Sequence, residues 1–352
     1  MAGVVGGALV PHAPQFFSLP ETEDKALVEK VRRKLGEVGE KLAALKPDLW
    51  IIVANDHASQ FLLHCTPQFA FHLGSEVKGS FVGRDFRYEV ASDLAMQLLL
   101  HMQEEGFDPA FTNNADIDYA FGIPLTFLGV TAPILPIYIN SYVPPQPSMN
   151  RAFAFGQALA RGVAAAGIKA VIIASGGMSH FPGTERYSNP EVDFDKKVFD
   201  IVASGNLRSL LGLDERTLDD TGNVELRSWA LAAGMLGERK PDIASFDPSW
   251  HHTYATIAWF SPKPERQDPL HYPGIAPERV RLTQLLYWLA NNPDERARYL
   301  ADPKGYCATA GLTPPEQEAL AAMDQSKLLR LGIHPLVSFL AHLQVERERK
   351  PH

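Results

Sequence analysis

Three histidines of this chain each come shortly after a short apolar segment. They are His12, His57 and His180, which follow residues 3–10, 49–54 and 170–174. Short apolar runs bounded by turn residues are typical of buried strands, and ligands bind beyond the carboxyl ends of strands in open α/β sheets. We therefore expect the three imidazoles at one edge of one sheet, where they could hold a metal ion or transfer protons.

A carboxylate would complete a metal site at this edge. Glu225 is the best candidate because it lies in the first turn of a predicted helix, and Asp219 and Asp220 are rival ligands. Two imidazoles and one carboxylate form the facial arrangement that holds non-haem Fe(II) and leaves positions open for a substrate and O₂. The third histidine would then be free for acid–base catalysis near pH 7. The structural alternative for Glu225 is a contact with the helix dipole or a capping box.

The neighbours of each histidine favour a functional role over that of a loop residue bonded to the backbone. Prolines on both sides fix the backbone around His12. Asn55 and Asp56 can turn the chain and orient the ring of His57. Two glycines shortly before His180 allow a close approach of the backbone.

A further histidine pair, His251 and His252, precedes the last predicted strand together with Thr253. This position places them at the same edge of the predicted sheet. We expect His252 and Thr253 to contact the substrate there.

The elements that must position these residues alternate along the first three quarters of the chain. The predicted strands cover residues 3–10, 49–54, 133–139, 170–175 and 254–260. The predicted helices cover residues 21–45, 89–105, 149–166, 192–203 and 224–235. Alternation at this spacing predicts an α/β fold with a central mixed sheet flanked by helices.

The last part of the chain has a different composition. A segment rich in proline and charge, residues 263–277, reads as a linker between a catalytic domain, residues 1–262, and a helical domain, residues 278–352. Its amphipathic helices are too short to be stable alone and should pack as a small all-helical domain. We expect this domain to act as a lid over the site, and its alternative role is dimerisation or packing.

Composition excludes several classes of function. A net charge of −8 over 352 residues argues against binding to nucleic acid or to an anionic membrane surface. Cys65 and Cys307 lie far apart and form no CxxC motif, so a disulfide framework is not expected. The first residues lack the pattern of a signal peptide, and no apolar run is long enough to span a bilayer. These features predict a cytoplasmic protein.

Several short motifs together resemble the class III extradiol ring-cleavage dioxygenases, the group that contains the β-subunit of protocatechuate 4,5-dioxygenase. The matching pieces are residues 11–14, 55–57, 118–125, 176–180 and 223–225 with Trp229. The C-terminal part is similar to the helical α-subunit of the same enzyme, and a fusion of the two resembles the gallate dioxygenases. The resemblance covers the catalytic part up to about residue 260 and the helical part after it.

The resemblance implies a set of roles for the residues above. Fe(II) would be held by His12, His57 and Glu225, with His180 as the acid–base residue. The partners would be O₂ and a small aromatic substrate. A homodimer is the default expectation for such an enzyme.

One position departs from the family pattern. Tyr119 stands where many members have a second active-site histidine, and a phenol stays neutral at pH 7. It could hold a substrate oxygen, but it would be a poor proton shuttle. The substrate therefore stays open between a gallate- or protocatechuate-like catechol, a dihydroxypyridine such as 3-hydroxy-4-pyridone, and a 2-aminophenol.

Two other classes of function also fit the residues. A zinc-dependent hydrolase could use the same histidines and carboxylate, because Zn²⁺ and Fe(II) accept the same ligand types. A non-catalytic binding protein could share the fold. The retained His180 and the helical part both favour catalysis.

Overall fold

The computed structural model describes residues 2–61, 65–261, 272 and 274–349. The chain divides into two compact units, Met1–Lys263 and Pro264–His352. The predicted linker, residues 263–277, lies largely outside the described residues. Among the helices that are described, none combines the length and the apolar character needed to cross a bilayer.

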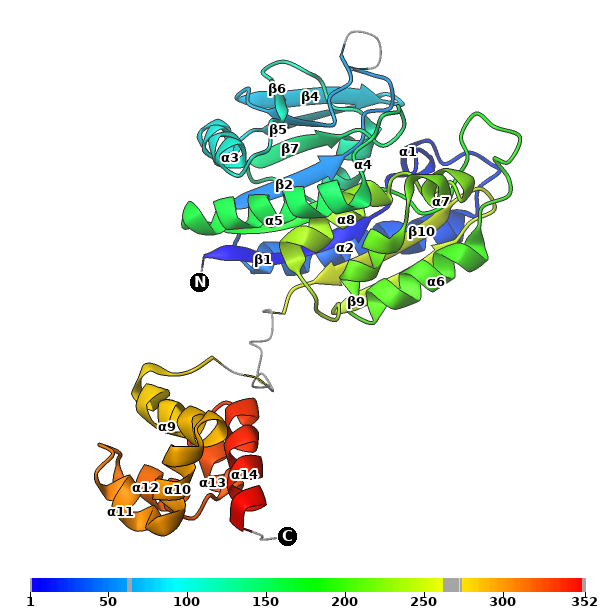
Figure 1. Cartoon of the computed structure of the whole chain (residues 1–352). Helices are drawn as coiled ribbons and strands as arrows, with labels where there is room; N and C mark the ends of the chain where they lie inside the picture. Colours follow the sequence, from blue (N-terminus) through cyan, green and yellow to red (C-terminus); the bar gives the residue numbers. More distant parts are fainter. Residues whose placement is uncertain (1, 62–64, 262–271, 273, 350–352) are drawn as a thin grey trace. The chain divides into compact units, whose positions relative to one another are not determined.

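The first unit is built on an eight-stranded sheet with the order β6-β3-β7-β2-β8-β1-β10-β9 (Figure 1). Its strands are β1 (Gly3–Val10), β2 (Leu49–Ala54), β3 (Phe69–His72), β6 (Ala110–Thr112), β7 (Ile134–Ile139), β8 (Lys169–Ser175), β9 (Ile243–Pro248) and β10 (Thr253–Trp259). The four central strands, β7, β2, β8 and β1, run parallel, whereas β10 is antiparallel to β1 and β9 is antiparallel to β10. The predicted mixed sheet is confirmed.

Helices cover both faces of this sheet (Figure 1). They are α1 (Gln15–Ser18), α2 (Lys25–Ala44), α3 (Ser92–Glu104), α4 (Tyr119–Phe127), α5 (Met149–Ala165), α6 (Val192–Ala203), α7 (Glu215–Asp220) and α8 (Leu226–Leu236), with a 3₁₀ helix at Leu207–Gly212. A separate hairpin of β4 (Glu76–Phe81) and β5 (Arg84–Glu89) completes the unit.

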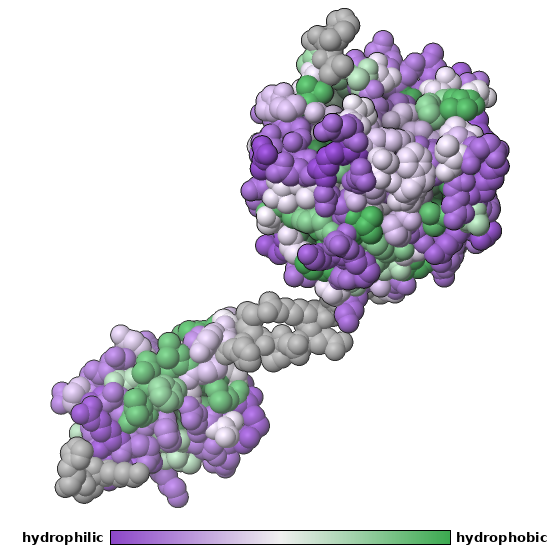
Figure 2. All heavy atoms as spheres, turned by 90° about the vertical axis from the view of Figure 1, so that its right-hand side faces the viewer, coloured by the Kyte–Doolittle hydropathy of each residue, from purple (hydrophilic) through white to green (hydrophobic). Residues whose placement is uncertain are grey.

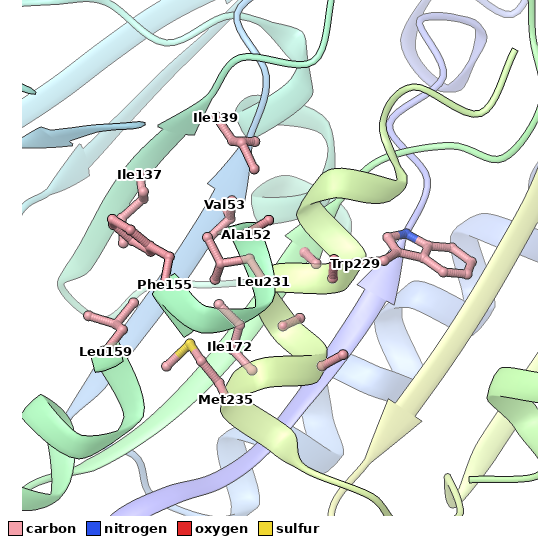
Figure 3. Close-up of a cluster of buried hydrophobic side chains, with 14 of the residues drawn as sticks. Val53, Ile137, Ile139, Ala152, Phe155, Leu159, Ile172, Trp229, Leu231 and Met235 are labelled. Atoms are coloured by element: carbon pink, nitrogen blue, oxygen red, sulfur yellow. The ribbon is translucent and has the colours of Figure 1, made fainter. Parts of the chain in front are cut away.

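The alternation of side chains along a strand divides the core into two layers. Along β2, Ile51 and Val53 join one cluster, while Trp50 and Ile52 join the other. The first cluster contains residues of α3, α5, α6 and α8, and the second contains residues of α1, α2 and α4. Figure 3 shows part of the first cluster, where Phe155 of α5 lies near the strands. Because both faces are buried, β2 carries apolar residues at every position.

The strand register sets the position of the loops that follow. Val10 pairs with Ser175, and Val53 pairs with Ala174. The carboxyl ends of β1, β2 and β8 are therefore level with one another. The loops that begin there carry the three histidines singled out in the sequence.

The second unit is all-helical, as predicted. Its helices are α9 (Val280–Asn291), α10 (Pro293–Ala301), α11 (Pro303–Ala308), α12 (Pro314–Ala321), α13 (Gln325–Arg330) and α14 (Pro335–Arg349), after a 3₁₀ turn at Pro277–Arg279. The Asn292 side chain caps α10, and Thr313 with Glu316 forms a capping box at α12. These caps and a shared core stabilise helices that are too short to persist alone. Hydrophobic side chains also reach the surface of this unit (Figure 2).

Candidate active site

His12, His57 and Glu225 lie together at the carboxyl edge of the sheet. Each offers one ligand atom, and these atoms lie within 4.8 Å of one another. Oε1 of Glu225 is 3.3 Å from Nε2 of His12, 3.5 Å from Nε2 of His57 and 3.7 Å from Nε2 of His180. The fold therefore brings together the three histidines and the carboxylate that the sequence singled out.

Glu225 is fully buried and held from its other side. Its Oε2 accepts a hydrogen bond of 2.6 Å from the backbone N–H of Gly177. The residue comes immediately before α8, which begins at Leu226 rather than at residue 224 as predicted. The indole N–H of Trp229 in that helix donates to the carbonyl of Gly176. The glycine loop after β8 and the start of α8 thus fix the carboxylate together. Any Cβ at position 177 would come within 1.9 Å of Nε2 of His252, so this close approach requires glycine.

The tautomer of His12 follows from its hydrogen bonds. Its Nδ1 lies 2.9 Å from Oγ of Ser175, and this hydroxyl donates its own hydrogen to the carbonyl of Ala120. Oγ of Ser175 must therefore accept from Nδ1–H of His12. The lone pair of His12 is left on Nε2, the atom that faces Glu225.

The same reasoning applies to His57. Its Nδ1 lies 2.9 Å from Oδ2 of Asp118, and a carboxylate can only accept, so Nδ1 carries the hydrogen. Nε2 then presents its lone pair toward Glu225, within 3.1 Å of Nδ2 of Asn55. Carboxylate partners of this kind commonly orient metal-binding histidines.

The first turn of α4 orients both of these histidines. Asp118 caps the helix by accepting from the N–H of Ala120 and also holds His57. The carbonyl of Ala120 holds Ser175, which in turn holds His12. This helix has no periodic pattern from which to predict it, because it is apolar on all sides and contains a proline.

His180 presents its Nε2 in the same way, and a tyrosine contacts that atom. Nδ1 of His180 donates to the carbonyl of Met178 over 2.9 Å. The hydroxyl of Tyr142 lies 2.9 Å from Nε2 of His180 and 3.0 Å from Oε1 of Glu225, and it has one hydrogen for these two acceptors. Sequence reasoning missed Tyr142, and its only signal was its position shortly after the apolar run of β7.

Lone pairs therefore outnumber hydrogens at this site. Three imidazole nitrogens and one carboxylate oxygen converge, and among the described residues the donors to them are the Tyr142 hydroxyl and the Asn55 amide. Acceptors at such distances repel one another unless a proton or another cation lies between them. Burial lowers the pKa of His57, but its hydrogen bonds with Asp118 and Glu225 outweigh burial and raise that pKa to about 9. Two imidazole nitrogens and a carboxylate oxygen form a donor set that fits a divalent transition metal.

The other groups of the site have shifted pKa values for related reasons. Burial raises the pKa of Glu225, but the nearby His12 and His180 imidazoles outweigh it, so the pKa lies well below its usual range. Burial lowers the pKa of His180, which favours a neutral imidazole. Burial and the Glu225 charge both raise the pKa of Tyr142, so its phenol keeps its hydrogen.

Tyr119 lies beside the cluster at the start of α4. Its ring stacks on His57 with a centroid distance of 4.4 Å and an interplanar angle of 26°. Burial, followed by the charges of Glu225 and Asp118, raises its pKa, so the phenol stays neutral. The ring of Phe81, at the tip of the β4–β5 hairpin, lies 4.7 Å from the Tyr119 ring between centroids.

His252 and Thr253 lie next to His180 rather than next to Glu225. The His252 ring is 3% exposed and stacks parallel on His180 at 4.3 Å. Thr253 is buried, and its backbone N–H donates to the carbonyl of Ser179. His251 turns away from the cluster and pairs with Glu23 over 3.0 Å.

The rival carboxylates lie outside this arrangement. Asp219 and Asp220 belong to α7, and Asp220 accepts a hydrogen bond from Arg216 in the same helix. Among the described residues, the metal-capable group consists of His12, His57 and Glu225.

Comparison with known proteins agrees with this geometry. Residues 6–261 match the family described as "Catalytic LigB subunit of aromatic ring-opening dioxygenase". Residues 282–344 match the family described as "Aromatic-ring-opening dioxygenase LigAB, LigA subunit". Both matches agree with the resemblance seen in the sequence motifs.

Individual relatives carry a consistent name. A 2,3-dihydroxyphenylpropionate/2,3-dihydroxicinnamic acid 1,2-dioxygenase from Cupriavidus necator is 24% identical over 284 residues, covering 66% of this chain and 91% of the relative. An enzyme of the same name from Klebsiella pneumoniae is 29% identical over 238 residues, covering 66% of this chain and 72% of the relative.

A solved structure also aligns with the chain. The crystal structure of an uncharacterized protein from Escherichia coli K12 covers 72% of this chain and 99% of its own, at 14% identity and a TM-score of 0.49. The family matches cover most of the sequence, including all of the residues that surround Glu225. The chain therefore belongs to the aromatic ring-opening dioxygenases and is a ring-cleaving enzyme.

Proposed function

We propose that this protein is a non-haem Fe(II)-dependent extradiol dioxygenase that opens an aromatic ring bearing two adjacent oxygen substituents in aromatic catabolism. His12, His57 and Glu225 would hold the metal. One observation carries the proposal. The hydrogen bonds of His12 and His57 fix their tautomers, so that both direct the lone pair of Nε2 toward Oε1 of the buried Glu225. A cation at that point relieves the repulsion among the acceptors.

The donor set and the family together favour iron. When bound, Fe(II) supplies open positions for the two substrate oxygens and for O₂. Zn²⁺ accepts the same ligands but has no redox chemistry with which to use O₂. Ring opening by members of this family is a dioxygenase reaction, which supports iron in this chain as well.

His180 is the proposed acid–base residue. Its Nδ1–H is fixed on the Met178 carbonyl, so the basic atom is Nε2, which faces the cluster. Burial keeps this imidazole neutral and able to accept the proton of a substrate hydroxyl. The same atom would return the proton to an oxygen leaving group later in the reaction. If Nε2 of His180 both accepts and returns the proton, it is not available as a metal ligand.

Tyr142 and Tyr119 are the proposed contacts for substrate oxygens. The Tyr142 hydroxyl lies within hydrogen-bond distance of both His180 and Glu225. When a substrate hydroxyl approaches Nε2 of His180, Tyr142 can donate to Glu225 instead of His180. Tyr119 offers a neutral phenol beside His57. Stacked on His57 and backed by Phe81, the Tyr119 ring also shields that side of the cluster from water.

The substrate class follows from these contacts and from the relatives. We propose a catechol with a ring substituent, such as gallate, protocatechuate or 2,3-dihydroxyphenylpropionate, or a dihydroxypyridine such as 3-hydroxy-4-pyridone. The names of the relatives favour the dihydroxyphenyl substrates. The neutral Tyr119 phenol favours a second candidate, 2-aminophenol, because a phenol can both donate to oxygen and accept from an amine.

The test begins with the metal-free protein loaded with Fe(II) or Zn²⁺ under argon. Each form is mixed with the substrates named above, and O₂ uptake is followed with an electrode while ring opening is followed by absorbance. We expect O₂ uptake with the Fe(II) form alone and with one class of substrate. Hydrolysis by the Zn²⁺ form without O₂ uptake would contradict the proposal, as would substrate binding without turnover by the Fe(II) form.

A further inference from the structure

A second cluster of buried polar groups lies beside the histidines and centres on Asp195 of α6. The Asp195 side chain is 0% exposed, and no step of the chemistry above uses it. Its carboxylate accepts from the backbone N–H of Ser179 at 3.2 Å, from Oγ of Ser179 at 2.5 Å and from Nδ2 of Asn223 at 2.9 Å. A buried carboxylate in an apolar fold is costly unless it is hydrogen-bonded in this way.

Each partner of Asp195 is a near neighbour of a site residue. Ser179 immediately precedes His180, and Asn223 lies two residues before Glu225. The backbone joins the same two segments, because the N–H of His180 donates to the carbonyl of Gly222 over 3.2 Å. Asp195 thus connects the loop that carries the acid–base residue to the loop that carries the carboxylate ligand.

The hydrogen bonds around Asp195 have a defined direction. Oγ of Ser179 donates to Asp195 and accepts from the backbone N–H of Glu191, over 2.8 Å. Nδ2 of Asn223 donates to Asp195 and to the carbonyl of Thr221. An acceptor is therefore required at position 195, and an amide nitrogen placed there would face donors.

We propose that Asp195 is a positioning residue that sets the spacing between His180 and Glu225 by holding Ser179 and Asn223. This inference rests on the proposed function, because it assigns a purpose to that spacing. Oε1 of Glu225 and Nε2 of His180 are 3.7 Å apart, so the proposed metal ligand and the proposed acid–base atom lie close together. Buried polar groups behind a metal site commonly orient its ligands in this way.

The first experiment replaces the carboxylate by its isostere. Asp195→Asn is compared with wild type and with Asp193→Asn, an exposed acid on the same helix. Fe(II) affinity is measured by equilibrium dialysis under argon, and kcat and KM are measured by O₂ uptake. We expect Asp195→Asn to lose about 10- to 100-fold in both Fe(II) affinity and kcat, with little change in KM, and Asp193→Asn to match wild type.

A second variant tests the direction of the hydrogen bonds. In Asp195→Asn/Asn223→Asp the amide and the carboxylate exchange places, so the bond between positions 195 and 223 can form with reversed polarity. The new carboxylate would face the Thr221 carbonyl, so the recovery should be partial. We expect Fe(II) affinity to return part of the way to wild type, whereas a role that is only structural predicts additive losses.

A third pair of variants separates the two loops and covers the case in which Asp195→Asn does not fold. Ser179→Ala loosens the His180 loop and should lower kcat while Fe(II) affinity is kept. Asn223→Ala loosens the Glu225 loop and should lower Fe(II) affinity first. Equal losses of kcat and Fe(II) affinity in Ser179→Ala and in Asn223→Ala would overturn the positioning role. Wild-type values of kcat and Fe(II) affinity in Asp195→Asn would overturn it as well.

These outcomes are distinct from failure of the proposed function. If wild type neither binds Fe(II) by dialysis nor consumes O₂ with any substrate, the iron dioxygenase proposal fails. If wild type does both and the Asp195 variants match it, only the positioning role fails.

Discussion

Two buried polar clusters lie side by side at the sheet edge, and they satisfy their hydrogen bonds in opposite ways. Around Asp195, each named donor meets an acceptor of the protein. Around Glu225, lone pairs of three imidazoles meet a carboxylate with few hydrogens to share. The first cluster can be stable as it folds, whereas the second requires a proton or a metal cation. In the proposed function, this difference separates the residues that position from the residues that hold the metal and react.

The largest expected effect comes from removing the charge at the centre of the reactive cluster. Glu225→Gln keeps the shape of the side chain but leaves no anionic ligand, so Fe(II) content should fall to near zero and ring cleavage should be lost. Metal analysis after anaerobic loading gives the readout, and Glu215→Gln, at an exposed position in α7, is the control. Normal iron content in Glu225→Gln would move the carboxylate ligand elsewhere.

The next largest effect separates catalysis from metal binding. His180→Ala should keep its iron and lose about 100- to 10,000-fold in kcat, because a positioned acid–base group contributes that range. Metal content and single-turnover ring cleavage are measured on the same preparation. Full turnover in this variant, or loss of iron from it, would remove the distinction drawn between His180 and the two ligand histidines.

A smaller loss is expected when an orienting hydrogen bond is removed. Ser175→Ala frees Nδ1 of His12 and should lower Fe(II) affinity by about 10- to 100-fold, as for other partners of metal-binding histidines. Ser204→Ala, at an exposed serine of the same unit, is the matched control. Equal affinities in the two variants would show that His12 does not depend on Ser175.

Metal affinity should also depend on pH in a defined direction. The pKa of His57 is raised to about 9 when its partners are the two carboxylates, so below that pH a metal must displace a proton from it. Affinity should therefore rise about tenfold per pH unit up to about pH 9 and then level off. Titrations with Co(II) at pH 7, 8 and 9 give the slope. Asp118→Asn removes one of the carboxylates that raise this pKa and should flatten the slope, and an unchanged slope would argue against that cause.

The smallest effect on the metal is expected in the helical unit. Its helix α14 exposes Leu336, Phe339, Leu340 and Leu343, which are spaced three and four residues apart. If this unit acts as a lid, Phe339→Ser/Leu343→Ser should raise KM several-fold and leave Fe(II) affinity unchanged. The oligomeric state is measured in parallel by light scattering. If α14 mediates dimerisation, the double substitution would lower the measured molecular mass instead of raising KM.

The sequence predicted the parts of the molecule whose patterns are local. The strand at residues 49–54 was predicted with its observed bounds, because a strand buried on both faces is apolar at each position. The second helix begins at Lys25, after the Asp24 cap, rather than at residue 21 as predicted. The predicted meeting of His12, His57 and His180 followed from strand ends that share one edge, whereas Glu225 was a candidate because of its place at the start of a predicted helix.

The residues that the sequence did not predict depend on contacts between distant segments. Tyr142 reaches His180 and Glu225 from a loop whose path has no periodic pattern. Asp195 reads as an ordinary acid in the first turn of a helix, where carboxylates favour the helix dipole. Only the folded chain shows that its oxygens bind Ser179 and Asn223.

The first turn of α4 orients His57 through Asp118 and His12 through Ser175, and it also carries Tyr119. The two imidazoles are therefore mechanically coupled, because a shift of this turn moves both of them together. A molecule that presses on Tyr119 would therefore displace both imidazoles at once. If these imidazoles hold the metal as proposed, recognition of a substrate and the geometry of the metal's ligands would not vary independently.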